Sequence, residues 1–196
     1  MSRYAQLEDA ALVREALAGR EEAYGELVRR FERPIYTLIL RMVRDPGLAE
    51  DLSQEAFIKA FGALDRYDPQ RKLASWLFKI AHNATIDHLR RKQLATVSLS
   101  ASAEEGEADW SSNIEDEEAV TPEQAAERTA LAEHLEQALG AMRPEYREVM
   151  VLRFEQGLQY NEISEVTGLA LGTVKTFIHR ARKELAETLR EEGWNV

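Results

Sequence analysis

Hydrophobic residues recur along most of the chain at the spacings of three and four positions that are typical of amphipathic helices. In residues 71–92, RKLASWLFKIAHNATIDHLRRK, one predicted face is apolar: Leu73, Leu77, Ile80, Ala81, Ala84 and Leu89. The same spacing predicts a helix over 7–18 and, after a break at Gly19, another that runs to about Val43 and contains Pro34. No segment alternates as a strand would, so the sequence predicts an all-α fold.

The dipeptide Asp45-Pro46 predicts the start of a further helix, with Asp45 as the N-cap and Pro46 in the first turn. Its apolar positions, from Leu48 to Leu64, are expected in the core. Its opposite face carries five residues: Asp51, Gln54, Glu55, Ile58 and Lys59. An isoleucine among polar side chains marks either a partner surface or an ordinary apolar residue at the protein surface.

The helical pattern disappears from about Ala95 and resumes after Thr121-Pro122. Residues 96–130 hold ten acidic residues and one basic residue, which favours a flexible acidic linker. We therefore expect two small helical domains, residues 1–95 and 131–196, joined by the linker 96–130.

The C-terminal domain shows the pattern of a helix-turn-helix. A short helix carries Ile163 and Val166, Thr167-Gly168 forms the turn, and a longer helix begins near Leu171. On that longer helix, four polar residues lie opposite the apolar positions: Lys175, Thr176, His179 and Arg180. The alternative is an ordinary helical hairpin with a solvated basic end.

The charge distribution favours contact with nucleic acid although the net charge is -10. Residues 66–92 hold seven Lys or Arg against two Asp, and residues 172–183 hold four against no acidic residue. In the first patch, one exposed line carries an aromatic, an amide and cations: Trp76, Lys79, Asn83 and Arg90. Such a line is either a solvated helix face or a stacking and phosphate-binding surface for unpaired DNA.

Several classes of protein are disfavoured by composition. The chain has no cysteine, so it has no disulfide, Cys-ligated zinc or thiol nucleophile. It shows no signal peptide and no apolar run of membrane-spanning length, and a cytoplasmic location is expected. The one cluster that suggests an enzyme, His82, Asp87 and His88, lacks the spacing of ligands on one helical face, so we assign these residues to packing or to the surface. No enzyme activity, metal or cofactor is expected.

Two segments carry a family resemblance. DLSQEAFIKAFGALDRYDPQRKLASWLFKIAHNATIDHLRR resembles region 2 of the extracytoplasmic-function (ECF) sigma factors, the bacterial promoter-recognition subunits of RNA polymerase. MRPEYREVMVLRFEQGLQYNEISEVTGLALGTVKTFIHRARKEL resembles their region 4. The two segments occur in the family's order and together cover most of the chain.

The resemblance implies a role for each polar surface. The surface of Asp51, Gln54, Glu55, Ile58 and Lys59 is expected to bind the polymerase clamp. The loop that begins at Tyr67 and the helix after it are expected to hold the melted minus-ten element, with contacts from Tyr67, Arg71, Lys72, Trp76, Lys79, Asn83 and Arg90. The helix-turn-helix is expected to bind the minus-thirty-five element through Thr173, Lys175, Thr176, His179 and Arg180.

The predicted function is therefore that of an alternative sigma factor, which binds core RNA polymerase and directs promoter-specific initiation. The expected partners are core RNA polymerase, promoter DNA and an anti-sigma factor that covers both domains. The alternative is a stand-alone helix-turn-helix regulator whose N-terminal domain senses a signal. Tight binding to duplex promoter DNA without polymerase distinguishes that regulator from a sigma factor.

Overall fold

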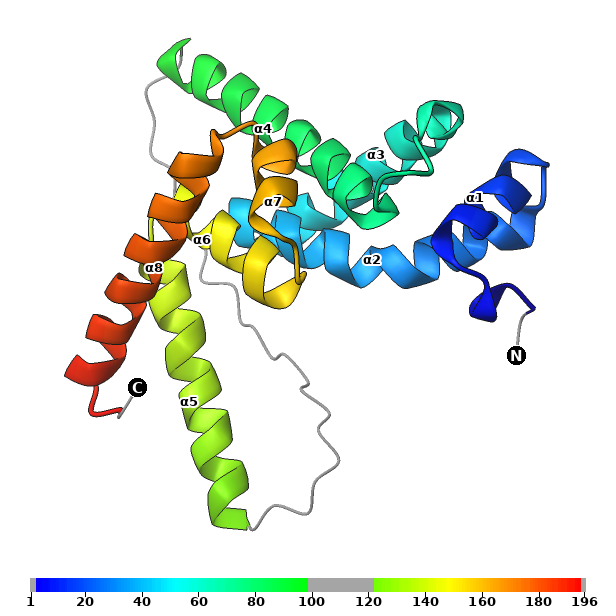
Figure 1. The fold of residues 1–196 in the computed structure, drawn as a ribbon. Coiled ribbons are helices and arrows are strands. Elements are labelled where there is room, and N and C mark those ends of the chain that lie inside the picture. Colours follow the sequence, from blue (N-terminus) through cyan, green and yellow to red (C-terminus); the bar gives the residue numbers. More distant parts are fainter. Residues whose placement is uncertain (1–2, 99–121, 195–196) are drawn as a thin grey trace.

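The computed structural model describes residues 3–98 and 122–194, with side chains described over 3–92 and 128–194. Over these residues the fold is all-α, as predicted, and no strand occurs among them. The elements, in order, are the 3-10 turn η1 (Arg3–Gln6), α1 (Asp9–Leu17), α2 (Glu21–Val43), α3 (Pro46–Gly62), the 3-10 turn η2 (Leu64–Arg66), α4 (Leu73–Ser98), α5 (Pro122–Ala141), α6 (Pro144–Met150), the π-helical turn η3 (Val151–Glu155), α7 (Tyr160–Thr167) and α8 (Leu171–Glu191) (Figure 1).

The N-terminal lobe, α1 to α4, is built from the start and stop signals that the sequence contains. Gly19 has φ +82°, a left-handed conformation that glycine adopts without steric cost, and the chain turns there between α1 and α2. The Asp45 side chain accepts a hydrogen bond from Leu48 N at 3.0 Å, and Pro46 opens α3. The predicted cap is therefore confirmed. Pro34 lies inside the single helix α2.

The C-terminal lobe contains the predicted helix-turn-helix in α7 and α8. A capping box starts α7: the Gln159 side chain and the Glu162 carboxylate satisfy each other's backbone N–H groups. The helix ends at Gly168, whose φ of +73° is left-handed. The predicted apolar positions are buried: Ile163, Val166, Val174, Ile178 and Ala181.

The two lobes pack directly on each other. Helix α7 lies against α4, and α6 and η3 lie against α2 (Figure 1). Buried side chains of the C-terminal lobe, among them Leu152, Ile163 and Val166, belong to the same hydrophobic cluster as Leu38 and Leu77 of the N-terminal lobe. Helix α1 lies at the right of the view, α4 runs across the top, and α5 and α8, which contact each other, lie at the lower left (Figure 1).

The boundaries differ from the sequence-based expectations in detail. The predicted helix 7–18 begins at Asp9, and Leu17 at its end is 49% exposed because its neighbours Val13 and Ala16 form the buried face. Residues 96–98 and 122–130 of the predicted linker are helical. At the second boundary, Pro122 opens α5 and is followed by strong helix formers. Residues 99–121 lie outside the described part of the chain.

Candidate nucleic-acid and polymerase interfaces

The first candidate surface lies on α3 and is exposed along its length. Asp51, Gln54 and Ile58 face solvent, and Ile58 is 73% exposed. Glu55 and Lys59 form an i,i+4 ion pair of 2.6 Å, and the hydrogen bond from Lys59 lowers the pKa of the Glu55 carboxyl. The exposed Ile58 side chain therefore lies among charged groups, two of which are held by the ion pair. An apolar residue surrounded by polar ones is typical of a small protein-binding patch.

The second candidate surface is the loop of residues 67–72 between η2 and α4. Tyr67 is buried: its hydroxyl donates to Arg71 O at 2.6 Å, and its ring centre lies 5.6 Å from that of Trp76. Burial raises the pKa of the Tyr67 hydroxyl. Asp68 Oδ1 accepts from Gln70 N at 2.9 Å, which shapes the turn. Tyr67 therefore supports the loop from within, and Arg71 and Lys72 lie on its exposed side.

Helix α4 carries the predicted stripe. Lys79, Asn83 and Arg90 are exposed, and Trp76 is half-buried against the core. The opposite face enters the core through Leu73, Leu77, Ala81 and Ala84. Cations and an amide on the open side can contact phosphates and base edges, and the half-buried Trp76 lies near them on the same helix.

The third candidate surface is the open face of α8. Lys175, Thr176, His179 and Arg180 are exposed, and Thr173 is half-buried in the first turn. The Thr176 hydroxyl donates to Gly172 O at 2.8 Å, one helical turn earlier in α8. A helix that presents cations and hydroxyls from its first turns has the composition of a helix that docks into a DNA major groove.

The structure also shows contacts between the lobes that the sequence did not predict. Lys72 Nζ lies 2.9 Å from Glu162 Oε1, and Arg71 Nη1 lies 3.1 Å from Glu165 Oε2, so two cations of the loop face two carboxylates of α7. His82 Nδ1 contacts Glu148 Oε1 of α6, and both side chains are buried. The partners are 66 or more positions apart in sequence, and a helical period carries no signal for them.

Two arginines complete the contact between the lobes. Arg41 of α2 pairs with Glu136 of α5 and with Glu155 of η3, the latter at 3.0 Å. Arg147 donates to Arg41 O at 2.9 Å and also caps carbonyls at the end of α5, Leu139 O and Gly140 O among them. Burial lowers the pKa of the Arg147 guanidinium. These hydrogen bonds tie the end of α5 to α2.

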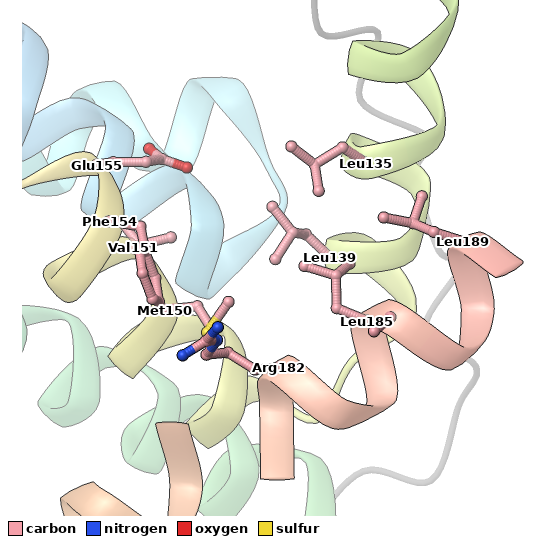
Figure 2. Close-up of a pocket in the computed structure, with 10 residues that line it drawn as sticks. Leu135, Leu139, Met150, Val151, Phe154, Glu155, Arg182, Leu185 and Leu189 are labelled. Carbon is pink, nitrogen blue, oxygen red and sulfur yellow. The ribbon is translucent and has the colours of Figure 1, made fainter. Parts of the chain in front are cut away.

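An apolar groove of about 530 Å³ opens between α5, η3 and α8. In Figure 2, Leu135 and Leu139 of α5 face Leu185 and Leu189 of α8, with Met150 and Phe154 on a third side. Phe154 is 56% exposed. The leucines of both helices recur at helical spacing in the sequence, but that spacing does not predict that the two helices enclose a groove.

The cluster that suggested an enzyme has a packing role. His82 is buried and contacts Glu148, whereas Asp87 points to solvent and His88 is half-buried. Within residues 3–92 and 128–194, no three His, Cys, Asp or Glu side chains form a group able to hold a metal ion. Over the helices described, no segment is both long and apolar enough to cross a bilayer.

Two family models match the chain. Sigma-70 region 2 matches residues 27–95, which include α3, the loop and most of α4. Sigma-70 region 4 matches residues 132–185, which include the helix-turn-helix. The match to region 2 does not favour the stand-alone regulator, because that alternative has a sensing domain in its place.

Similar proteins cover nearly the whole chain. The ECF RNA polymerase sigma factor SigW of Bacillus subtilis is 34% identical over 91% of this chain and 95% of its own. The ECF RNA polymerase sigma-E factor of Escherichia coli is 32% identical over 92% of this chain and 93% of its own length. Among solved structures, CnrH in complex with the cytosolic domain of CnrY has a TM-score of 0.63 at 26% identity, over 94% of this chain and 99% of the other. The sigma factor RpoE of Bartonella quintana, solved with the anti-sigma factor NepR, has a TM-score of 0.70 at 21% identity, over 85% of this chain and 96% of the other. At that identity the similarity supports the fold alone. The chain thus belongs to the ECF sigma factors of the sigma-70 family.

Proposed function

We propose that the chain is an alternative sigma factor that binds core RNA polymerase and directs promoter-specific initiation of transcription. The observation that carries the proposal is the presence of three separate exposed surfaces on one chain, on α3, on the loop with α4, and on α8. A regulator that binds only duplex DNA needs one of them. A protein that joins polymerase, melted DNA and duplex DNA needs all three.

Each surface has a proposed role that follows from its chemistry. The exposed Ile58 among polar residues suits a protein partner, the polymerase clamp. Arg71, Lys72 and the α4 stripe suit a single strand, because unpaired bases offer faces for stacking and phosphates for cations. The open face of α8 suits the minus-thirty-five duplex. In this division Tyr67 positions the loop, because its side chain is buried and its hydroxyl donates to Arg71 O.

The proposed partners include an anti-sigma factor. The solved relative CnrH, 26% identical to this chain, is bound by another protein, the cytosolic domain of CnrY. In this chain the groove between α5, η3 and α8 offers leucine and phenylalanine side chains to such a protein. The proposed activity makes and breaks no covalent bond by itself, and it takes place where bacterial promoter DNA lies, in the cytoplasm.

Transcription of genomic DNA in a purified system tests the function. Core polymerase of the host is incubated with fragmented genomic DNA, with and without the protein, and the 5′ ends of the transcripts are sequenced. We expect a set of new start sites that share two upstream sequence elements. Unchanged start sites, together with tight binding of duplex fragments by the protein alone, would show that the chain is a stand-alone regulator.

A further inference from the structure

The groove between α5, η3 and α8 is an apolar surface that is open to solvent. Leu135 and Leu139 of α5 face Leu185 and Leu189 of α8 across it (Figure 2). Phe154 of η3 lies on a third side and is 56% exposed. A contiguous apolar surface of this kind, in a chain with 31% charged residues, marks a place where another segment or molecule binds.

The backbone of η3 supports a binding role for this groove. Gln156 N donates to Val151 O at 3.0 Å, so the hydrogen bond spans five residues where an α-helix spans four. Such π-helical turns are rare, and most of them occur at functional sites. Within this turn Val151 and Leu152 are buried, whereas Phe154 stays exposed at the groove.

The charges that line the groove indicate what kind of segment fits it. Glu155 and Arg182 are the two charged residues of the lining. The Glu155 carboxylate is paired within the chain, with Arg41 at 3.0 Å. Among residues 3–92 and 128–194, Arg182 has no carboxylate within ion-pair distance. The groove therefore suits a segment whose apolar side chains are flanked by carboxylates.

The chain itself contains a segment of this composition. Residues 104–118, EEGEADWSSNIEDEE, lie outside the described residues. Their two large apolar residues, Trp110 and Ile114, have four acidic residues before them and four after them. The spacing of four positions is the one at which two side chains share one side of a helix. A segment that only joins two domains needs neither of these apolar side chains.

The segment is long enough to reach the groove. Leu135 lies 13 residues beyond Pro122, the first residue of α5, which is about 20 Å along the helix. Ile114 precedes Pro122 by eight residues, and eight extended residues span up to about 26–29 Å. A tethered segment has an effective concentration in the millimolar range, so an intrinsic Kd of about 0.1 mM is enough to fill the groove about nine-tenths of the time.

We propose that residues 104–118 dock in the groove between α5, η3 and α8. Trp110 and Ile114 then lie among the leucines and Phe154, and the flanking carboxylates pair with Arg182. A protein that binds this groove must displace a segment of the same chain, which lowers its apparent affinity about tenfold at nine-tenths occupancy. For the proposed anti-sigma factor that consequence rests on the proposed function, whereas the docking itself does not.

The first experiment follows Trp110 in the full chain. Incorporation of 5-fluorotryptophan gives one fluorine resonance for each of the three tryptophans, and Trp110→Phe identifies the one from Trp110. In the native chain we expect this resonance to lie away from its position in the urea-unfolded chain. Phe154→Asp should lower the docked fraction and move the resonance most of the way to that position. Leu17→Asp on α1, at a similarly exposed leucine, should leave it unchanged.

The other tryptophans report whether Phe154→Asp keeps the fold. The resonance of Trp76, which packs against the core, should not move, because Phe154 is more than half exposed and its replacement leaves the core intact. A Trp110 resonance that already lies at the unfolded position in the wild type would overturn the proposal. A native Trp110 resonance that Phe154→Asp does not move would also overturn it.

The second experiment tests the charge. Arg182→Gln should lower the ratio of docked to undocked segment about threefold, read from the same resonance, because it removes one exposed ion pair. Lys183→Gln is the matched control, since Lys183 is the next cation of α8, pairs with Glu187 and does not line the groove. Salt should weaken docking in the wild type more than in Arg182→Gln. Equal effects of the two substitutions would overturn the role of Arg182 as the partner of the acidic flanks.

A third experiment locates the segment directly. The chain has no cysteine, so a pair can be introduced without interference. Ser112→Cys with Ala186→Cys joins the segment to the groove lining, and Ser112→Cys with Glu187→Cys joins it to the exposed neighbour of Ala186 at nearly the same loop length. We expect the first pair to form its disulfide at least about fivefold faster. Equal rates would overturn the proposal.

These measurements are independent of the proposed function, because they use the free chain without polymerase or DNA. Failure of the wild type to assemble with core polymerase would refute the proposed function and leave the docking intact. A segment that does not dock would overturn the inference and leave the proposed function intact.

Discussion

The exposed isoleucine of α3 gives the sharpest test of polymerase docking. Ile58 is 73% exposed in the free chain, next to the exposed Gln54 on the same helix. The variant Ile58→Asp removes an apolar side chain from the surface and adds a charge at the same position. Because the side chain contributes little to the core, we expect the free energy of unfolding to change by no more than about 0.5 kcal/mol.

The effect on assembly should be much larger. Full burial of an isoleucine is worth about 1.5–3 kcal/mol, so covering the exposed part of Ile58 in an interface is worth about 1–2 kcal/mol. An aspartate buried there without a partner adds a further cost of desolvation. Since about 1.4 kcal/mol corresponds to a tenfold change in Kd, we expect Ile58→Asp to weaken holoenzyme assembly at least about tenfold. Combination with Gln54→Ala should abolish assembly at micromolar concentrations.

The assay is competition between labelled wild type and unlabelled variant for core polymerase, with thermal unfolding measured in parallel. Leu17→Asp is the matched control, because Leu17 is another exposed leucine-sized side chain, 49% exposed, on α1. It should compete like the wild type. If Ile58→Asp competes equally well, or if it lowers the melting temperature as a core substitution does, α3 is not the docking surface.

Two further predictions concern DNA and acid stability. Arg180→Ala should weaken binding of the minus-thirty-five duplex and lower the slope of log K against log salt concentration by about one. Asn83→Ala and Trp76→Ala should leave duplex binding unchanged and slow promoter opening, which permanganate reactivity measures. Equal effects of all three variants on duplex binding would contradict separate surfaces for duplex and melted DNA. Hydrogen bonds from Arg29 and Arg30 lower the pKa of the buried Glu26 from 4.5 to about 2, so its contribution to stability is complete above pH 4.5 and is lost as the pH falls toward 2. The melting temperature of Glu26→Gln should therefore lie below that of the wild type at neutral pH and converge with it toward pH 2; a constant difference would contradict the shifted pKa.

Local features of the fold were predictable from the sequence because their causes are local. Asp45 caps the helix that Pro46 opens, and Gly168 ends α7 in a left-handed conformation, each through contacts within a few residues. The exposed face of α3 followed from the helical period in the same way, and Ile58 is indeed on the surface. A stretch of about ten residues contains all the information that such features need.

The contact between the lobes was not predictable for the converse reason. His82 was assigned to packing or to the surface, but nothing in its neighbourhood indicates Glu148 as a partner. Tyr67 was predicted as a DNA contact, and its burial depends on how η2 and α4 approach each other. Arg71 and Lys72 were identified as cations of the loop, whereas their pairing with α7 depends on the packing of one lobe on the other. Periodicity assigns a residue to a face, and it does not specify which other segment covers that face.

A last prediction concerns the buried pair of His82 and Glu148 and the reason why this part of the contact between the lobes is polar. The free energy needed to remove two charged or polar groups from water offsets much of their mutual attraction, so such a buried pair contributes little net stability. When the lobes separate, water solvates both groups again. His82→Leu alone leaves the buried Glu148 without its partner, and we expect it to destabilise the closed form by about 3–5 kcal/mol and to open the lobes.

The double variant His82→Leu with Glu148→Met replaces the pair by apolar side chains of similar size, and its closed form should be as stable as the wild type or more stable. Opening it exposes apolar surface to water, because no polar group is there to be solvated again, so holoenzyme assembly should be slower than for the wild type. Small-angle scattering of the free chain and the rate of assembly with core polymerase measure the two quantities. If the double variant assembles as fast as the wild type while remaining closed, the polar pair has no part in opening, and its role is only to fix how the lobes pack.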